Sequence, residues 1–355
     1  MKRFFICSLV WGSLFTTAAK ADQSQLNVSR VSSILEVVCP SNRTTSVGLP
    51  VMLNPVGHYE KVAALTASSV TVAGTPYAAM QFALPTAPHS LIIIGGPNDG
   101  LALPIVAHVS GSSTLAVAPG AMPSTIKPGL ERILVVPNFT LGTLLGNSSA
   151  AVQLVENVAP GLADKVALVM GGLRTEYFFN GTEWKLVSAP TGASQNDVPV
   201  PLDSGVEVIR LAQTPADEVG LVLVGVQRTG PQRVVLAAGS SRLVSNPHLT
   251  TRTLASSGLS AAVQRGSSPA TADKVELDGV QYFFSSTANG WRLVSTPSGP
   301  SQDGVVLGVG KAVRIDRLVA RTWPLGWSNG RPRRSLIPFT GLGQTSWVLR
   351  EPFIP

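Results

Sequence analysis

Short apolar runs recur along the chain and alternate with segments that contain glycine, proline or polar residues. The clearest runs are LIII at 91–94, VALV at 166–169 and LVLV at 221–224. Short runs at regular spacing, bounded by turn residues, are typical of antiparallel sandwiches, barrels and meanders. The pattern therefore predicts a mainly β protein.

A three-stranded meander is predicted between residues 165 and 188. Strands are expected at 165–170, 175–179 and 183–188, with turns at Gly171-Gly172 and Asn180-Gly181. Asn-Gly is a strong hairpin signal because both residues accept a positive φ. Short helical or irregular pieces are expected near 141–145 and 254–259.

The chain also contains two similar segments. Five blocks recur in the same order, displaced by 105 to 109 positions: ADKV at 163–166 and 272–275, YFF at 177–179 and 282–284, WKLVS and WRLVS at 184–188 and 291–295, PTGASQ and PSGPSQ at 190–195 and 297–302, and GVEVIRL and GKAVRIDRL at 205–211 and 310–318. Ordered self-similarity of this kind indicates an internal repeat. In the second copy, Asp278-Gly279 takes the first turn of the meander and 288–290 the second.

Three similar strand-and-turn segments, at 135–139, 243–247 and 348–352, bracket the two copies. They predict β-repeat units at 137–245 and 246–355, preceded by an N-terminal β-rich domain at 22–136. Within that domain, the glycine-rich segment 95–100 follows an apolar run as a phosphate loop would. It lacks the lysine and hydroxyl residue of such a loop, and strand-like sequence continues after it, so a hairpin turn is expected.

The N-terminus has the pattern of a signal peptide. Lys2 and Arg3 precede an apolar run at 4–15, and Ala19-Lys20-Ala21 supplies the small residues of a cleavage site before Asp22. We expect residues 1–21 to direct Sec-type export to the periplasm, cell surface or exterior. The run is shorter than the roughly 20 residues of a membrane-spanning helix, and no transmembrane segment is expected in the mature chain.

Cys39 is the one thiol that remains after this cleavage, so the mature chain cannot form an internal disulfide. Stability must then come from burial, which a chain of this length can supply through two or three domains. A buried Cys39 is favoured over an intermolecular bridge.

Charged residues are scarce, at 13%, and the net charge is +7. Much of the excess lies after residue 310, where eight basic residues face only Asp316 and Glu351. Arg331, Arg333 and Arg334 are candidates for contact with an anionic surface such as lipopolysaccharide or an acidic glycan. The alternative is a solvated edge whose arginines discourage strand pairing. Nucleic acid is not an expected partner of an exported protein.

The aromatic clusters leave two roles open. Strand alternation places Tyr177 on the face opposite to its neighbour Phe178, so at least one ring must be buried. Tyr177, Trp184, Tyr282 and Trp291 are candidates for stacking on sugar rings, but packing in a core is favoured because they recur at equivalent positions.

No catalytic set is recognisable. The four histidines lie in unrelated contexts, Cys39 has no evident partner, and no Gly-x-Ser-x-Gly segment occurs. Asp164 and Asp273, each followed by lysine, are interpreted as turn caps or local ion pairs. Asp197 and Asp303 follow Ser-Gln and suggest at most a weak calcium loop, which lacks the dense oxygen ligands of a strong site. No metal and no cofactor are expected.

With these blocks, the chain resembles a family of exported β-rich repeat proteins of Gram-negative bacteria with no known activity. The resemblance rests on Asp-Lys-Val, the Tyr-Phe-Phe strand, the Trp strand and the Gly-x-x-hydrophobic-x-Arg ending, and it extends to 49–55 and 140–144. The chain departs from the family by lacking Trp after Val169 and by its arginine-rich tail. The resemblance implies export and β-repeat architecture, and it implies no activity.

These patterns favour an exported structural, adhesive or surface-associated protein without catalytic activity. Its expected partner is an envelope polysaccharide or another surface protein. The alternative is a glycan-binding or glycan-active envelope protein that uses the four strand aromatics.

Overall fold

A computed structural model describes residues 32–318 and 325–327, except 56–59, 75–81, 85–86, 109–110, 119–120, 171, 213–216, 228–231, 235–238 and 247–249. The described chain is mostly β-structure in antiparallel sheets, as the sequence pattern predicted. The two helices described are short, and neither has the length and apolarity that crossing a membrane requires.

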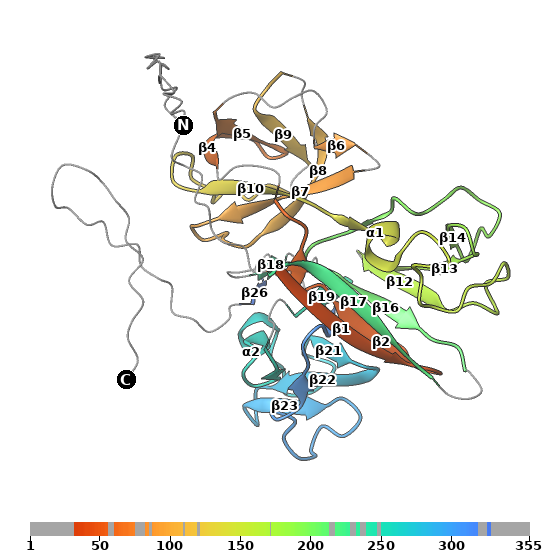
Figure 1. Cartoon of the computed structure of the whole chain (residues 1–355). Helices are drawn as coiled ribbons and strands as arrows, with labels where there is room; N and C mark the ends of the chain where they lie inside the picture. The colour runs from red at the N-terminus through yellow and green to blue at the C-terminus, as the bar shows by residue number, and fades with distance from the viewer. Residues whose placement is uncertain are drawn as a thin grey trace, which may run out of the picture.

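A closed six-stranded barrel forms the upper part of the molecule in Figure 1. Its strands run in the order β10-β4-β5-β9-β8-β7, and β10 closes the barrel because it pairs with both β7 and β4. Closure removes the exposed strand edges. β6 (Ala83–Leu84) pairs with β7 outside the ring. The barrel strands are β4 (Glu60–Leu65), β5 (Ser69–Ala73), β7 (Ala87–Ile94), β8 (Ala102–His108), β9 (Thr114–Val117) and β10 (Arg132–Pro137). The segment at 95–100 joins β7 to β8 as a hairpin connection, as predicted.

The first subdomain combines residues 32–52 with residues 139–227. Its main sheet has the order β14-β13-β12-β16-β2, and smaller sheets pair β1-β17-β3 and β11-β15. Its elements are β1 (Ser32–Pro40), β2 (Thr44–Gly48), β3 (Val51–Met52), β11 (Phe139–Thr140), α1 (Leu141–Leu145), β12 (Lys165–Met170), β13 (Leu173–Phe179), β14 (Trp184–Leu186), β15 (Pro199–Val200), β16 (Gly205–Ile209) and β17 (Glu218–Gln227).

The second subdomain spans residues 232–327 and has the same pairing order. β23-β22-β21-β25-β19 form its main sheet, and the smaller pairs are β18–β26 and β20–β24. Element by element among the described residues, β3 is the one strand without a counterpart. Its elements are β18 (Gln232–Val234), β19 (Ser241–Ser245), β20 (Arg252–Thr253), α2 (Leu259–Ala262), β21 (Lys274–Leu277), β22 (Val280–Ser285), β23 (Gly290–Leu293), β24 (Val306–Leu307), β25 (Ala312–Asp316) and β26 (Leu325–Trp327).

The barrel occupies the connection between β2 and β11, whereas residues 246–251 alone connect the corresponding strands β19 and β20. The sheets therefore divide the chain differently from the expected ranges 22–136, 137–245 and 246–355. β2 belongs to the main sheet of the first subdomain, and β19 belongs to that of the second. The segments 135–139 and 243–247 are not equivalent either, since β10 closes the barrel. The segment 348–352 lies outside the described residues.

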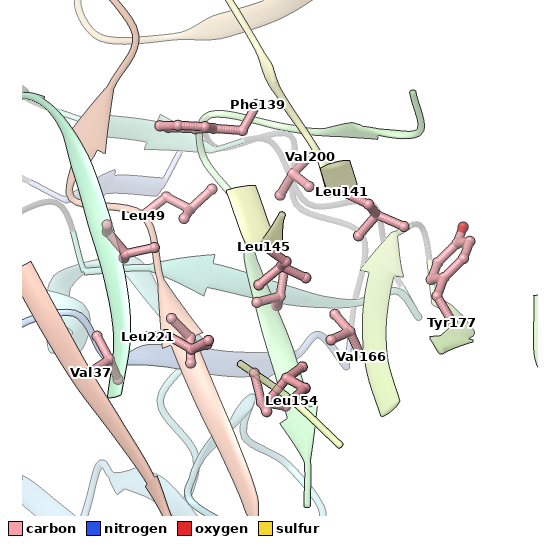
Figure 2. Close-up of a cluster of buried hydrophobic side chains, with 14 of the residues drawn as sticks. Val37, Leu49, Phe139, Leu141, Leu145, Leu154, Val166, Tyr177, Val200 and Leu221 are labelled. Atoms are coloured by element: carbon pink, nitrogen blue, oxygen red, sulfur yellow. The ribbon is translucent and has the colours of Figure 1, made fainter. Parts of the chain in front are cut away.

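Apolar side chains of the first subdomain come together from strands far apart in the sequence (Figure 2). Val37 and Leu49 precede the barrel, whereas Phe139, Tyr177 and Leu221 follow it, and all five are buried in one core. The second subdomain and the barrel each have a core of their own. Cys39 is buried and free, as expected, so burial replaces disulfide bonds as the source of stability.

The two subdomains meet along β2, β16, β19 and β25. The amide of Gly48 donates to the carbonyl of Gly310 (2.7 Å), and the amide of Ser245 donates to the carbonyl of Asp203 (3.4 Å). The two contacts are equivalent. In each, the last residue of β2 or β19 donates to a residue that precedes a strand of the other subdomain. A side chain at Gly205 would clash with Cβ of Ala312 in the second subdomain, so glycine is required for this close approach.

Candidate functional site

The four aromatic candidates for sugar stacking lie inside the two subdomain cores. Trp184 and Trp291 are fully buried, and Tyr177 and Tyr282 are 5% and 6% exposed. The indole N–H of Trp184 donates to the carbonyl of Gly146 (2.8 Å), and that of Trp291 donates to the carbonyl of Leu254 (3.1 Å). The packing role favoured by the sequence therefore holds, and the rings offer no open face to a glycan.

Asp164 and Asp273 are buried anchors rather than local caps. The carboxylate of Asp164 accepts from the amides of Val155 and Leu211 and from Nε of Arg210 (2.7 Å), and the Asp164 and Arg210 side chains are fully buried. Three donors compensate the loss of water around this carboxylate. Neither aspartate is joined by an ion pair to the lysine that follows it within the described chain.

The second subdomain repeats this anchor. The Asp273 carboxylate accepts from the amides of Gln264 and Leu318, and Nη1 of Arg317 lies 3.8 Å from its Oδ2. In both subdomains the aspartate precedes one strand of a pair and the arginine follows the other, so the buried ion pair holds the ends of two paired strands together. The motif Asp-Lys-Val is therefore structural at both positions.

The calcium expectation does not match the contacts of Asp303. Its Oδ1 accepts from the amide of Trp291 (2.8 Å), and the same place in the first subdomain is taken by Asn196, whose Oδ1 accepts from the amide of Trp184 (2.9 Å). Asp303 thus corresponds to Asn196 and not to Asp197. Across the described ranges, no group of three or more His, Cys, Asp or Glu side chains is placed to hold a metal ion. Arg331, Arg333 and Arg334 lie outside the described residues.

Two histidines of the barrel come together, which the sequence did not suggest. His89 and His108 lie on neighbouring strands and are 7% and 4% exposed. The ring of Phe82 contacts both, edge-on to His89 at 5.4 Å and stacked on His108 at 5.7 Å between centroids. Burial lowers the pKa of His89, which keeps the ring neutral in the apolar barrel.

A cleft of about 420 Å³ opens where the two subdomains meet. The first subdomain lines it with the end of β1, the loop after it and the start of β2, and the second lines it with the β21–β22 turn and the residue before β25. The lining residues are Pro40, Arg43, Thr44, Thr45, Asp278, Gly279 and Lys311. Arg43 and Thr44 are exposed, whereas Thr45 is buried.

The charges of the cleft do not cancel. Nζ of Lys311 lies 3.1 Å from Oδ2 of Asp278 and 3.2 Å from Oδ1. No ion pair joins Arg43 to any residue in the described part of the chain, so one positive charge is in excess. Both residues of the Asp278-Gly279 turn have positive φ, 48° and 82°, as in a type I′ hairpin turn. The ion pair with Lys311 holds the Asp278 carboxylate at the cleft.

Cys39 lies behind the cleft, next to Thr45. Burial raises the pKa of its thiol from 9.0 to about 11, and a hydrogen bond with Thr45 and the charge of Lys311 oppose the shift more weakly. The thiol is therefore protonated at neutral pH, and it is not a nucleophile for catalysis.

The sequence offered no signal for the cleft. Its basic residues, Arg43 and Lys311, lie far apart in the chain, and Asp278-Gly279 was interpreted only as a turn. No protein-family model, curated protein or solved structure matches the chain.

Proposed function

We propose that the chain is an exported, non-enzymatic structural protein of the bacterial envelope or cell surface, built from two copies of one β unit. The copies are residues 32–52 with 139–227, and residues 232–327. The barrel is an insertion in the first copy. The proposal includes the resemblance to exported β-repeat proteins noted from the sequence.

The observation that carries the structural role is the match between the polar contacts inside the two subdomains. Asp164 and Asp273 are buried and accept from equivalent backbone amides, and Trp184 and Trp291 are buried and each donates to a backbone carbonyl of its subdomain. These residues, kept in both copies, therefore maintain the scaffold. The glycan-binding alternative loses the support of the strand aromatics, because their rings are buried.

Cell fractionation tests the proposal. The full chain with a C-terminal tag should appear as a processed form that begins at Asp22 and sediments with the envelope or leaves the cell. Ala19→Arg should block processing, because signal peptidase requires a small residue there. Recovery of the uncleaved wild-type chain from the cytosol would overturn the export claim, and a processed protein found only free in the periplasm would overturn the envelope association.

A further inference from the structure

The two ends of the junction between the subdomains differ. At one end, the β12–β13 turn lies against the start of β19, where the amide of Gly172 donates to the carbonyl of Ser241 (2.9 Å). At the other end, the corresponding β21–β22 turn faces the start of β2 across the 420 Å³ cleft. The same scaffold thus closes one end by a direct backbone contact and leaves the other end open.

The residues at the open end also differ in charge from their counterparts. Arg43 precedes β2 as Ser240 precedes β19, and Lys311 precedes β25 as Ser204 precedes β16. The closed end therefore carries two serines where the cleft carries two cations. Structural residues such as the buried Asp and Trp pairs are the same in both subdomains, so the scaffold itself does not require the charges of the cleft.

The groups in the cleft have complementary chemistry for an acidic, hydroxylated ligand. Arg43 presents a planar guanidinium, which matches a carboxylate in bidentate fashion. Lys311 and Thr44 supply further hydrogen-bond donors, and the fixed carboxylate of Asp278 accepts from hydroxyl groups. Pro40 adds an apolar wall. The volume falls within the roughly 300–1,000 Å³ typical of small-ligand sites.

We propose that this cleft binds a hexuronic acid unit of an acidic polysaccharide, with Arg43 on the carboxylate and the Asp278–Lys311 pair on ring hydroxyls. The proposal supplies a ligand for the envelope role, and it rests on that role only for the origin of the polysaccharide. Binding is measured on purified protein, so failed export and failed binding are distinguishable.

The test is a calorimetric titration of the purified mature chain with D-galacturonate and D-glucuronate, compared with D-galactose, D-glucose, acetate and inorganic phosphate. At least one uronate should bind at least tenfold more tightly than its neutral sugar, than acetate and than phosphate. Arg43→Gln should weaken this binding at least tenfold, because it removes the guanidinium from an exposed side chain.

Lys61→Gln is the matched control, since it removes the same charge from an exposed position on β4 in the barrel. It should bind the uronate as the wild type does. A thermal melt of each variant verifies folding. If Arg43→Gln fails to fold, Thr44→Val takes its place, and it should weaken binding by removing one donor.

Three results would overturn the proposal. Equal binding of the neutral sugar would show that the carboxylate is not recognised, and equal or tighter binding of phosphate or acetate would indicate a simple anion site. Absence of binding to both uronates, or equal affinity in the wild type, the cleft variant and Lys61→Gln, would show that the cleft is not the site.

Discussion

The chain has an apolar interior, few charges and no disulfide, so its stability depends on how individual buried residues satisfy their polar atoms. Cys39, Trp184 and Trp291 are all fully buried, yet each meets a polar partner. A buried polar atom that keeps its partner costs little, whereas one that loses it costs about 1–3 kcal/mol.

Cys39 should be unreactive in the folded protein and should reduce stability at high pH. The pKa of the thiol is about 11 in the folded state, against an ordinary value of 9.0. Between these pH values the folded chain therefore retains a proton that the unfolded chain loses. Stability from this group is complete below pH 9 and falls as the pH rises to about 11. Urea denaturation between pH 8 and 11 should show this decline, and Cys39→Ala should reduce it. Rapid labelling of the native thiol at pH 7 would contradict the burial.

Trp184→Phe and Trp291→Phe should each destabilise the protein by about 1–3 kcal/mol, because each removes an indole donor from a backbone carbonyl and leaves a gap in a core. Since the two rings lie in separate cores, the losses should add in the double variant. Urea denaturation measures both effects. Unchanged stability together with a loss of glycan binding would instead favour the stacking role.

At the scale of elements, glycine decides how closely the two main sheets approach. A Cβ at Gly205 would lie only 2.9 Å from Cβ of Ala312 on β25, in the main sheet of the second subdomain, and it would also clash with the carbonyl oxygen of Val47 in its own sheet. Gly205→Ala should therefore cost about 1–3 kcal/mol, as overpacking typically does. Gly304→Ala is the control, because nothing lies within 4 Å of the added atom. Equal unfolding midpoints of the two variants would contradict the tight junction.

The sequence predicted elements formed by residues that are close together in the chain. It missed strand pairings between residues that are far apart in the chain. Strand 165–170 and the helical piece 141–145 were predicted correctly, because local periodicity and turn residues determine them. The second helix begins at Leu259, at the end of its predicted range, because a turn occupies the residues before it.

The placement of β2 in the sheet of β16 was not predictable, since Thr45 pairs with Val208 although the whole barrel lies between them in the sequence. The cleft depends on this long-range placement, because Arg43 precedes β2 and Lys311 precedes β25. Its residues were therefore missed, whereas burial of the aromatic rings was favoured because they recur at equivalent positions in the two copies.

At the scale of the whole molecule, the barrel has the contacts expected of an inserted domain. Its core residues all come from 62–135, and its strands close on one another. It meets the first subdomain through an apolar cluster in which Leu134 and Val136 lie with Met52, Leu202 and Val226. In the second subdomain, residues 246–251 form the connection that corresponds to the one occupied by the barrel.

Replacing residues 49–138 with a copy of 246–251 should therefore leave a folded chain of two subdomains. The variant should keep an antiparallel β circular dichroism spectrum and a cooperative thermal transition. Its melting temperature should be lower, because the replacement also removes Leu49 and Val51 from the core of the first subdomain, and because the barrel no longer covers the apolar surface of Leu202 and Val226. The separate fragment 54–138 should fold as a compact monomer, because its core is internal and its strands pair with one another, although it loses the hydrogen bond between the amide of Arg233 and the carbonyl of Gly100. If neither protein folds, the barrel is an integral part of the first subdomain. If only the fragment folds, the barrel is independent but the first subdomain requires its support.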